Sequence, residues 1–355
     1  MAESAVPAPQ SQAVIETQYL VILSIAACHL INDVMQSVLS ASYPLMQQEF
    51  GLSFSQIGLM TLAFMGTASI LQPLVGMVTD RHPFAQSLTL GMGSTLLGLM
   101  MLAQATSYPF LLLGAALIGI GSAVFHPEAS RVARAAAGRK FGTAQSFFQV
   151  GGNLGHAVGP LLVAFIVAPS GRGAIVWFAL FALVGMAILS QVGRWHARHR
   201  KSGRKSVAIP PHDLTRRRVV LTIGLLAFLV FTKNIYSASL GSYYTFFLID
   251  RFQLTTQEAQ MMLFLFLAAS AAGGVFGGPI GDRIGTRAVI WVSILGVLPF
   301  TLALPYANLF WTGALTVAIG LVMSSAFPAI LVFAQELVPG RVGLIAGLFF
   351  GLSFG

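Results

Sequence analysis

The chain has 355 residues, of which 56% are hydrophobic and only 9% are charged. Soluble domains carry about a quarter charged residues, so this composition excludes an ordinary soluble enzyme, and 37 glycines without a strict period exclude collagen. Twenty Lys and Arg against 11 Asp and Glu give a net charge of +9. The class that remains is a helical membrane protein with many spans.

The N-terminal tail, residues 1–18, is polar and lacks the basic start and the small-residue cleavage site of a signal peptide. We expect this tail to stay in the cytoplasm. The single cysteine, Cys28, lies in an apolar run and predicts a buried packing residue without redox or zinc chemistry. We therefore expect no metal site and no cofactor.

Ten apolar segments are long enough to cross a bilayer, which takes about 20 residues. They do not alternate between apolar and polar residues as barrel strands do, and only helices satisfy their own backbone groups in hydrocarbon. The sequence therefore predicts an all-α polytopic fold. The expected spans are 19–46, 55–79, 84–104, 108–133, 142–168, 172–193, 219–248, 257–281, 288–306 and 309–333.

Basic residues gather in the loops on one side of these spans. Seventeen of the 20 fall there, nine of them in the loop 194–218, whereas Arg172 and Arg251 lie on the other side and Lys233 lies inside a helix. Because basic loops stay in the cytoplasm, we expect a multi-pass membrane protein with a cytoplasmic N-terminus. The basic loop suits anionic lipid rather than nucleic acid.

The chain contains two copies of one unit, related by a shift of 202 residues. The predicted units are a bundle of six helices over 19–193, the linker 194–218, and a second bundle over 219–355 with helices seven to ten and the start of eleven. Parallel repeats of six helices form one large class of transporters, with the substrate site between the halves. The second copy would end near residue 395, so we expect the fold to be truncated here after about ten complete spans, with about 40 residues to follow.

The segments GMVTDR at 76–81 and GPIGDRIGTR at 278–287 occupy matching loops of the two halves. This pair resembles the loop signature of the major facilitator superfamily, which implies a gating loop. The residues concerned are Gly76, Asp80, Arg81, Gly278, Asp282, Arg283 and Arg287. The first copy departs from the family pattern at 82–84, where His-Pro-Phe replaces a glycine and further basic residues.

Within that superfamily, several segments resemble the fosmidomycin resistance proteins. They are HLINDVMQS at 29–37, VFHPEASRVAR at 124–134, AQSFFQVGGN at 144–153, SYYTFFL at 242–248 and AQELVPGR at 334–341. The resemblance implies a drug exporter in the bacterial inner membrane that uses the inward proton gradient. Gly155, Gly159 and Pro160 are similar to the antiporter signature of helix five, although Val163 and Ala164 replace its last glycines.

Polar residues repeat at spacings of three and four along the first span, which places them on one helix face. The members of this face are His29, Asn32, Asp33, Gln36 and Ser40. An ionisable group inside a membrane costs about 2.5–3.5 kcal/mol at the helix centre, so each one is a functional candidate. For Asp33 we consider proton carriage, a structural ion pair and substrate contact.

The fourth span carries a second set of candidates. His126 and Glu128 can serve as proton or substrate groups or form a structural pair. Arg131, three residues after Glu128, can pair with it or reach the lipid headgroups. The predicted proton-coupling residues are therefore Asp33, Glu128, His29 and His126.

Neutral hydrogen-bonding side chains and two cations form the predicted substrate site. Because Lys233 can offset negative charge and amides can orient a ligand, the set suits a small polar or anionic solute. Its members are Asn32, Gln36, Arg131, Gln149, Asn153, Lys233, Asn234, Tyr243 and Tyr244. The tyrosines can equally be interfacial anchors, and His156 reads as a structural histidine.

Three functions follow from these patterns. The first is a monomeric proton-coupled exporter of a small, fosmidomycin-like compound, without enzymatic activity. The second is uptake or uncoupled transport of a sugar or an organic anion, since one fold hosts both directions. The third, a sensor or membrane-embedded enzyme, is disfavoured because the sequence has no ATP-binding loop, paired cysteines or catalytic serine motif.

Overall fold

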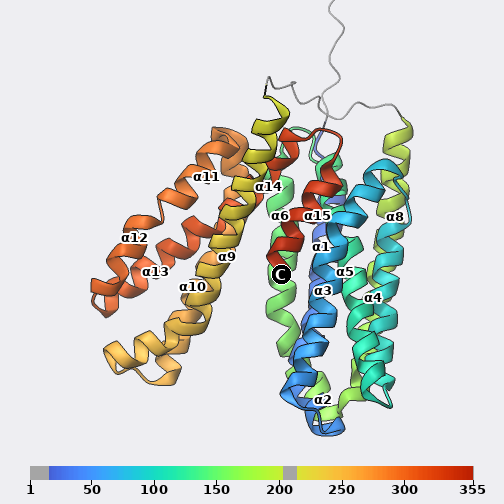
Figure 1. The fold of residues 1–355 in the computed structure, drawn as a ribbon, viewed down its shortest axis with the longest axis horizontal. Helices are drawn as coiled ribbons and strands as arrows, with labels where there is room; N and C mark the ends of the chain where they lie inside the picture. The colour runs from blue at the N-terminus through green and yellow to red at the C-terminus, as the bar shows by residue number, and fades with distance from the viewer. Residues whose placement is uncertain (1–15, 203–213, 355) are drawn as a thin grey trace, which may run out of the picture.

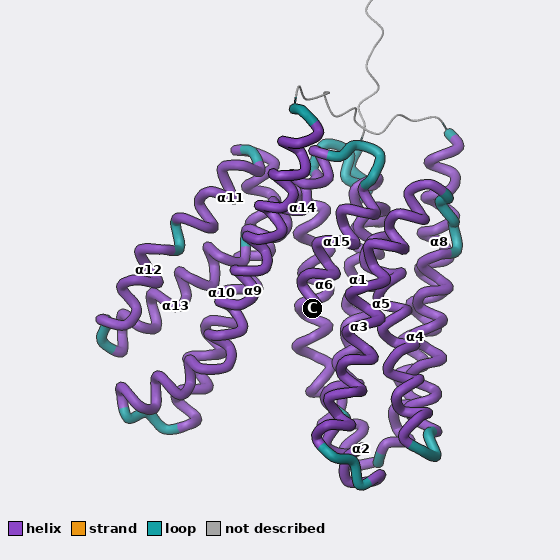
Figure 2. Tube along the Cα trace, in the orientation of Figure 1, coloured by secondary structure: helices purple, strands orange, loops and turns teal. Residues whose placement is uncertain are grey.

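A computed structural model describes residues 16–202 and 214–354. These residues form helices and no strand (Figure 2). The elements are α1 (Tyr19–Ala41), α2 (Tyr43–Phe50), α3 (Phe54–Arg81), α4 (Ser87–Gln104), α5 (Tyr108–Ala136), α6 (Phe141–Leu162), η1 (Val163–Val167), α7 (Ala168–Ser170), η2 (Arg172–Trp177), α8 (Phe178–Lys201), α9 (Arg216–Phe252), α10 (Thr256–Ile284), α11 (Thr286–Leu295), α12 (Leu298–Ala303), η3 (Leu304–Tyr306), α13 (Leu309–Ser324), α14 (Ala326–Leu337) and α15 (Val342–Phe354).

Ten helical segments are long and apolar enough to cross a membrane, which confirms the predicted polytopic fold. The ninth and tenth spans are broken into α11, α12 and η3, and into α13 and α14. In the ninth, Pro299 occupies the first turn of α12, where its missing N–H is tolerated. Part of the predicted linker 194–218 is helical, since α8 runs to Lys201, while 203–213 lies outside the described residues.

The internal repeat is visible in how the second helix of each half begins. Ser53 and Gln56 form a capping box at the start of α3, and Thr255 and Glu258 form the same box at the start of α10. In each box the hydroxyl and the side chain three residues later satisfy backbone N–H groups that the helix leaves unpaired. The shift of 202 residues therefore relates local structure as well as sequence.

The helices pack into two groups that meet at one end. Helix α1 packs along α6, and α5 packs on α3 and α4, while α10 packs on α13. The largest contacts between the first helix group (α1 to α8) and the second (α9 to α15) are those of α15 with α3 and of α10 with α6, and α15 also packs on α5 and α14 on α6. Figure 1 shows α9 to α13 diverging from α1 to α8 with distance from the end that carries the basic linker. The groups are thus closed against each other at the linker end.

Candidate functional site

The predicted polar face of α1 is buried in the first helix group. His29, Asn32, Asp33 and Gln36 are each at most 3% exposed. A face of this polarity cannot lie against lipid, because each unsatisfied polar group would cost several kcal/mol there. It instead packs between α5 and α6, and the carboxylate of Asp33 lies at its centre.

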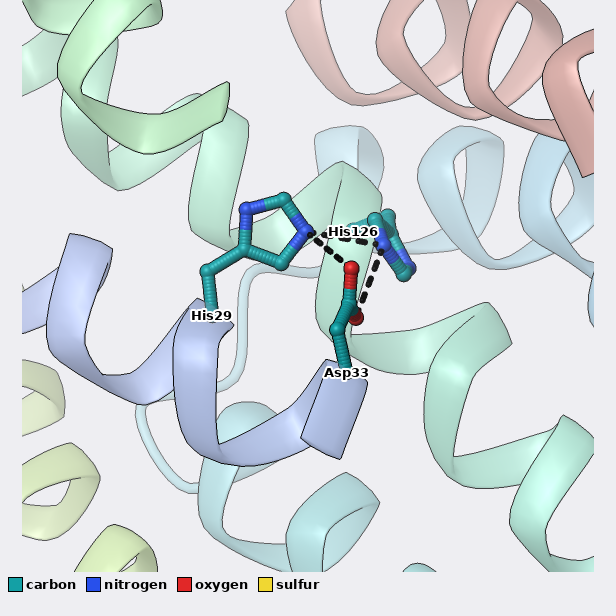
Figure 3. Close-up of side chains that lie close together, drawn as sticks. All are labelled: His29, Asp33 and His126. Carbon is teal, nitrogen blue, oxygen red and sulfur yellow. Dashed lines mark hydrogen bonds and ion pairs between the residues drawn. The ribbon is translucent and has the colours of Figure 1, made fainter. Parts of the chain in front are cut away.

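Three histidines from three helices surround the Asp33 carboxylate (Figure 3 shows two of them). The Oδ2 atom lies 3.2 Å from His29 Nε2 on α1 and 3.0 Å from His156 Nδ1 on α6. The Oδ1 atom lies 3.8 Å from His126 Nε2 on α5. Asn32 and Gln36 each donate a side-chain N–H to Oδ1, at 3.0 and 3.2 Å. We call Asp33, His29, His126 and His156 the histidine–aspartate cluster.

Glycines on α6 allow this cluster to form. Gly155 packs against the Leu30 backbone and Asp33. A Cβ on Gly152 would lie 2.5 Å from His29 Cε1 and 2.8 Å from Asp33 Oδ2. Because only glycine lets the α6 backbone approach α1 so closely, these two positions bring His156 within hydrogen-bond distance of Asp33.

Replacing Gly152 with Ala is therefore expected to abolish transport. The added methyl group must displace His29 or Asp33, and overpacking of this kind costs about 1–3 kcal/mol. This cost exceeds the stabilisation that the higher helix propensity of Ala provides. The measurement is substrate flux and thermal stability of the purified variant in proteoliposomes. The matched control is Gly66→Ala on α3, where a Cβ would meet nothing within 4 Å. Full activity of Gly152→Ala would show that the tight approach of α6 is unnecessary.

Backbone carbonyls fix the orientation of two of the imidazoles. His29 Nδ1 lies 2.7 Å from the carbonyl oxygen of Phe148, and His126 Nδ1 lies 3.0 Å from that of Ser122. A carbonyl oxygen only accepts, so each Nδ1 carries the hydrogen and donates it. In the neutral form of either ring, Nε2 therefore presents a lone pair. These two Nε2 atoms face each other at 3.2 Å, beside the carboxylate.

This convergence of electron pairs favours a bound cation. The atoms of His29, Asp33 and His126 that could bind a metal ion, a ring nitrogen or a carboxylate oxygen from each, all lie within 4.8 Å of one another. A proton shared among them would convert two of the repulsive contacts into hydrogen bonds, and a small metal ion could be held by the same atoms. This cluster is thus a buried place, among the described residues, where a positive charge is electrostatically favoured.

Aromatic rings cover the buried side of the cluster. The ring of Phe148 stacks on His29 with centroids 4.0 Å apart, and Phe125 lies 5.6 Å from both His29 and His126. Phe350 on α15, from the second helix group, lies 5.1 Å from His126. These rings are at most 3% exposed, so they exclude water from the His29 and His126 side and strengthen the electrostatic interactions there.

Glu128 and Arg131 belong to a different network, at the linker end of α5. The Arg131 guanidinium donates to Glu128 and to the Thr79 carbonyl oxygen, and Ser87 donates to the second oxygen of Glu128 at 2.7 Å. Arg131 Nη1 also lies 3.6 Å from Asp80 Oδ1. The structure therefore places Glu128 beside the loop motif at 76–81 and not beside Asp33.

The two copies of the loop motif make the same kind of contact across the helix groups. The Asp80 carboxylate accepts hydrogen bonds from the backbone N–H groups of Gly343 and Leu344, both at 2.9 Å, in the first turn of α15. Asp282 accepts from the N–H groups of Gly142 at 2.7 Å and Thr143 at 2.8 Å, in the first turn of α6. Carboxylates are stabilised at helix N-termini. We call these contacts the Asp80 latch and the Asp282 latch.

Glycines of the motif complete the latches. Gly76 lies against the Gly343 carbonyl group, and Gly278 lies against that of Gly142. Of the basic residues in the motif, Arg287 lies over the ring of Phe333 at 5.1 Å. Arg81 and Arg283 are in the last turns of α3 and α10, where positive charge offsets the helix dipole.

The other substrate candidates are distributed over both helix groups. Gln149 and Asn153 lie on α6, and the Asn153 amide is near Gly274 of α10. Lys233 and Asn234 lie on α9, with Lys233 Nζ 5.9 Å from the ring centre of Phe327.

The two tyrosines of α9 differ from each other. Tyr244 is buried and its hydroxyl hydrogen-bonds with that of Thr316 at 2.8 Å, whereas Tyr243 is 69% exposed.

The sequence favours a structural histidine at His156, and the structure places its ring 3.0 Å from the Asp33 carboxylate, a position that the sequence did not predict. The signal that could have identified it is the glycine series on α6, Gly151, Gly152, Gly155 and Gly159, which marks a face in close contact with another helix. His156 lies one residue beyond Gly155, so it is carried to the edge of that contact.

Comparisons with known proteins agree with this architecture. The family model described as Major Facilitator Superfamily matches residues 25–355. The fosmidomycin resistance protein of Escherichia coli (strain K12) is 54% identical over 96% of this chain and 84% of its own length. YfnC, an uncharacterized MFS-type transporter of Bacillus subtilis (strain 168), is 38% identical over the same shares of the two chains.

Among solved structures, the fucose:proton symporter FucP of E. coli matches with a TM-score of 0.70 at 14% identity. The match covers 96% of this chain and 89% of that one, and it shows a likeness of fold. The family match, the 54% identical relative and the ten membrane helices give one conclusion. The chain belongs to the major facilitator superfamily of membrane transporters.

Proposed function

We propose that this transporter is a proton-coupled exporter of a small polar or anionic compound of the fosmidomycin type. The histidine–aspartate cluster is the observation that carries the proposal, because it is a buried site for one positive charge inside the membrane. The 54% identity to a fosmidomycin resistance protein supports the choice of substrate. We place the N-terminus and the basic linker in the cytoplasm, with the monomer in the bacterial inner membrane.

One proton fits the geometry of the cluster. With a proton on His29 Nε2, the ring donates through Nδ1 to the Phe148 carbonyl group and through Nε2 toward Asp33 Oδ2 and His126 Nε2. Without that proton, two lone pairs and a carboxylate oppose each other in a water-poor site. Asp33, His29 and His126 therefore carry the coupled proton, and Glu128 supports the Asp80 latch through Arg131.

Lys233 supports an anionic substrate. No salt bridge to Lys233 exists among residues 16–202 and 214–354. A membrane-embedded cation without a carboxylate partner is costly unless something else offsets it. The negative group of a phosphonate drug can offset it, while Asn234, Gln149 and Asn153 supply hydrogen bonds.

The latches support a cycle of alternating access. They hold the linker end closed, while the two groups diverge toward the opposite end (Figure 1), and we propose that the opposite end is the open one in this conformation. In an antiporter, the outward-facing state releases the substrate and takes up the proton, and the protonated protein then returns inward. Proton occupancy of the cluster thus sets which conformation the empty carrier prefers.

The test is fosmidomycin accumulation by everted membrane vesicles that contain the transporter. Acidification of the vesicle lumen should drive accumulation, and an uncoupler should reduce it to the level of vesicles without the protein. Accumulation that survives the uncoupler would contradict proton coupling. Equilibration of a sugar or an organic anion without accumulation of fosmidomycin would favour the alternative, uncoupled facilitation.

A further inference from the structure

His156 differs from the rest of the histidine–aspartate cluster in its exposure. Its side chain is 51% exposed, whereas those of Asp33, His29 and His126 are at most 4% exposed. Asp33 is therefore sealed from water, yet its Oδ2 atom is 3.0 Å from a ring that reaches the surface. A proton can cross that distance along one hydrogen bond.

The exposed edge of His156 faces the second helix group rather than lipid. On a helix with 3.6 residues per turn, His156 shares a face with Gln149, Asn153 and Pro160, and Asn153 lies near Gly274 of α10. The exposed apolar residues Leu154 and Leu161 lie on a separate face. The exposed edge of the His156 ring thus lies on the polar side of α6 and faces the region between the two groups.

The hydrogen bonds of His156 orient it for transfer. Its Nδ1 lies near two acceptors, Asp33 Oδ2 at 3.0 Å and the Gly152 carbonyl oxygen at 3.3 Å, so Nδ1 carries the hydrogen. The charged groups that face it are Asp33 from α1 and, behind Asp33, His29 and His126. The charged residues of α10, Glu258, Asp282 and Arg283, lie near the ends of that helix, and Glu336 lies at the end of α14.

We propose that His156 is the proton-exchange residue of the cluster, through which Asp33 loads and releases its proton in this conformation. This inference rests on the proposed proton coupling. Water delivers a proton to Nε2, Nδ1 passes its own proton to Asp33 Oδ2, and this oxygen passes the proton on to His29 Nε2, 3.2 Å away. Release runs by the same steps in reverse. The rings of Phe148 and Phe350 close the opposite side, so exchange takes place at one face of the membrane at a time.

The test is chemical rescue of His156→Ala in proteoliposomes with an internal pH-sensitive dye. We expect substrate-driven proton flux to fall by at least about 10-fold, as for loss of a general acid or base, and to rise again with added imidazole, which can occupy the exposed space left by the ring. His156→Gln keeps a hydrogen-bonding side chain that fills this space, so its flux should be low, unchanged by imidazole, with an unaltered KM for substrate. His199→Ala, on α8, is the matched control.

Two results would overturn the shuttle: wild-type flux in His156→Gln, or a slow His156→Ala that imidazole does not restore. The proposed function fails separately, if Asp33→Asn keeps its proton flux. If Asp33→Asn loses that flux while both His156 variants keep it, the exporter stands and the shuttle is wrong.

Discussion

Replacing Asp33 with Asn is expected to abolish proton-driven export while the protein still folds and binds its substrate. Asn has nearly the same volume, so packing against Gly152 and Gly155 is kept. It cannot carry the negative charge that pairs with His29 and His156. We expect uphill transport to fall by about 100-fold or more and its dependence on external pH to disappear. The measurement is pH-driven accumulation in proteoliposomes.

Exchange of labelled for unlabelled substrate separates a coupling defect from a folding defect. Exchange moves no net proton, so Asp33→Asn should retain it. The matched control is Asp250→Asn, which removes an exposed carboxylate near the end of α9 and should leave accumulation unchanged. Accumulation by Asp33→Asn at the wild-type rate would mean that the coupled proton is held elsewhere.

The sequence predicted the residues that α1 contributes to the cluster but not how the other helices bring their histidines to them. Spacings of three and four predicted that His29, Asn32, Asp33 and Gln36 share a face, because local helix geometry decides that. The pairing of His29 with His126 depends on how α1 crosses α5, which no local pattern encodes. Hydropathy predicted the ten spans for a similar reason, since length and apolar content suffice.

Glu128 and Asp33 looked equivalent in the sequence, as acids buried in apolar helices. The structure separates them by their cationic neighbours: histidines for Asp33, and Arg131 for Glu128. Histidine can exchange a proton near neutral pH, whereas arginine stays charged. The same residue type therefore suits a proton site in one place and a fixed ion pair in the other, and only the tertiary contacts distinguish the two.

Replacing Asp282 with Asn is expected to open the linker end of the transporter. The Asp282 carboxylate accepts three hydrogen bonds from the start of α6, two from backbone N–H groups and one from the Thr143 hydroxyl at 2.6 Å. Hydrogen bonds to a charged acceptor contribute about 1.5–3 kcal/mol each. The amide oxygen of Asn can still accept hydrogen bonds, but these are the weaker, neutral kind. A loss of about 1.4–2.8 kcal/mol lowers the ratio of closed to open molecules about 10- to 100-fold.

The opening can be measured as a distance between two spin labels at the linker end. Gln86, before α4, and Ile284, at the end of α10, are exposed positions on the two helix groups, and each can be replaced with Cys for labelling. Cys28→Ser removes the one native thiol. Asp282→Asn should shift the label distances to longer values.

The matched control is Glu258→Gln, which removes a carboxylate at the opposite end of α10. The capping-box hydrogen bonds of Glu258 are made with Thr255, in its own helix group. If Asp282→Asn and Glu258→Gln give the same distances as the unaltered chain, the Asp282 latch does not hold the two halves together. In that case closure of the linker end must come from the packing of α15 on α3 and from the Asp80 latch. Asp80→Asn would then produce the longer distances, because its carboxylate is the remaining charged acceptor at a helix start across the two groups.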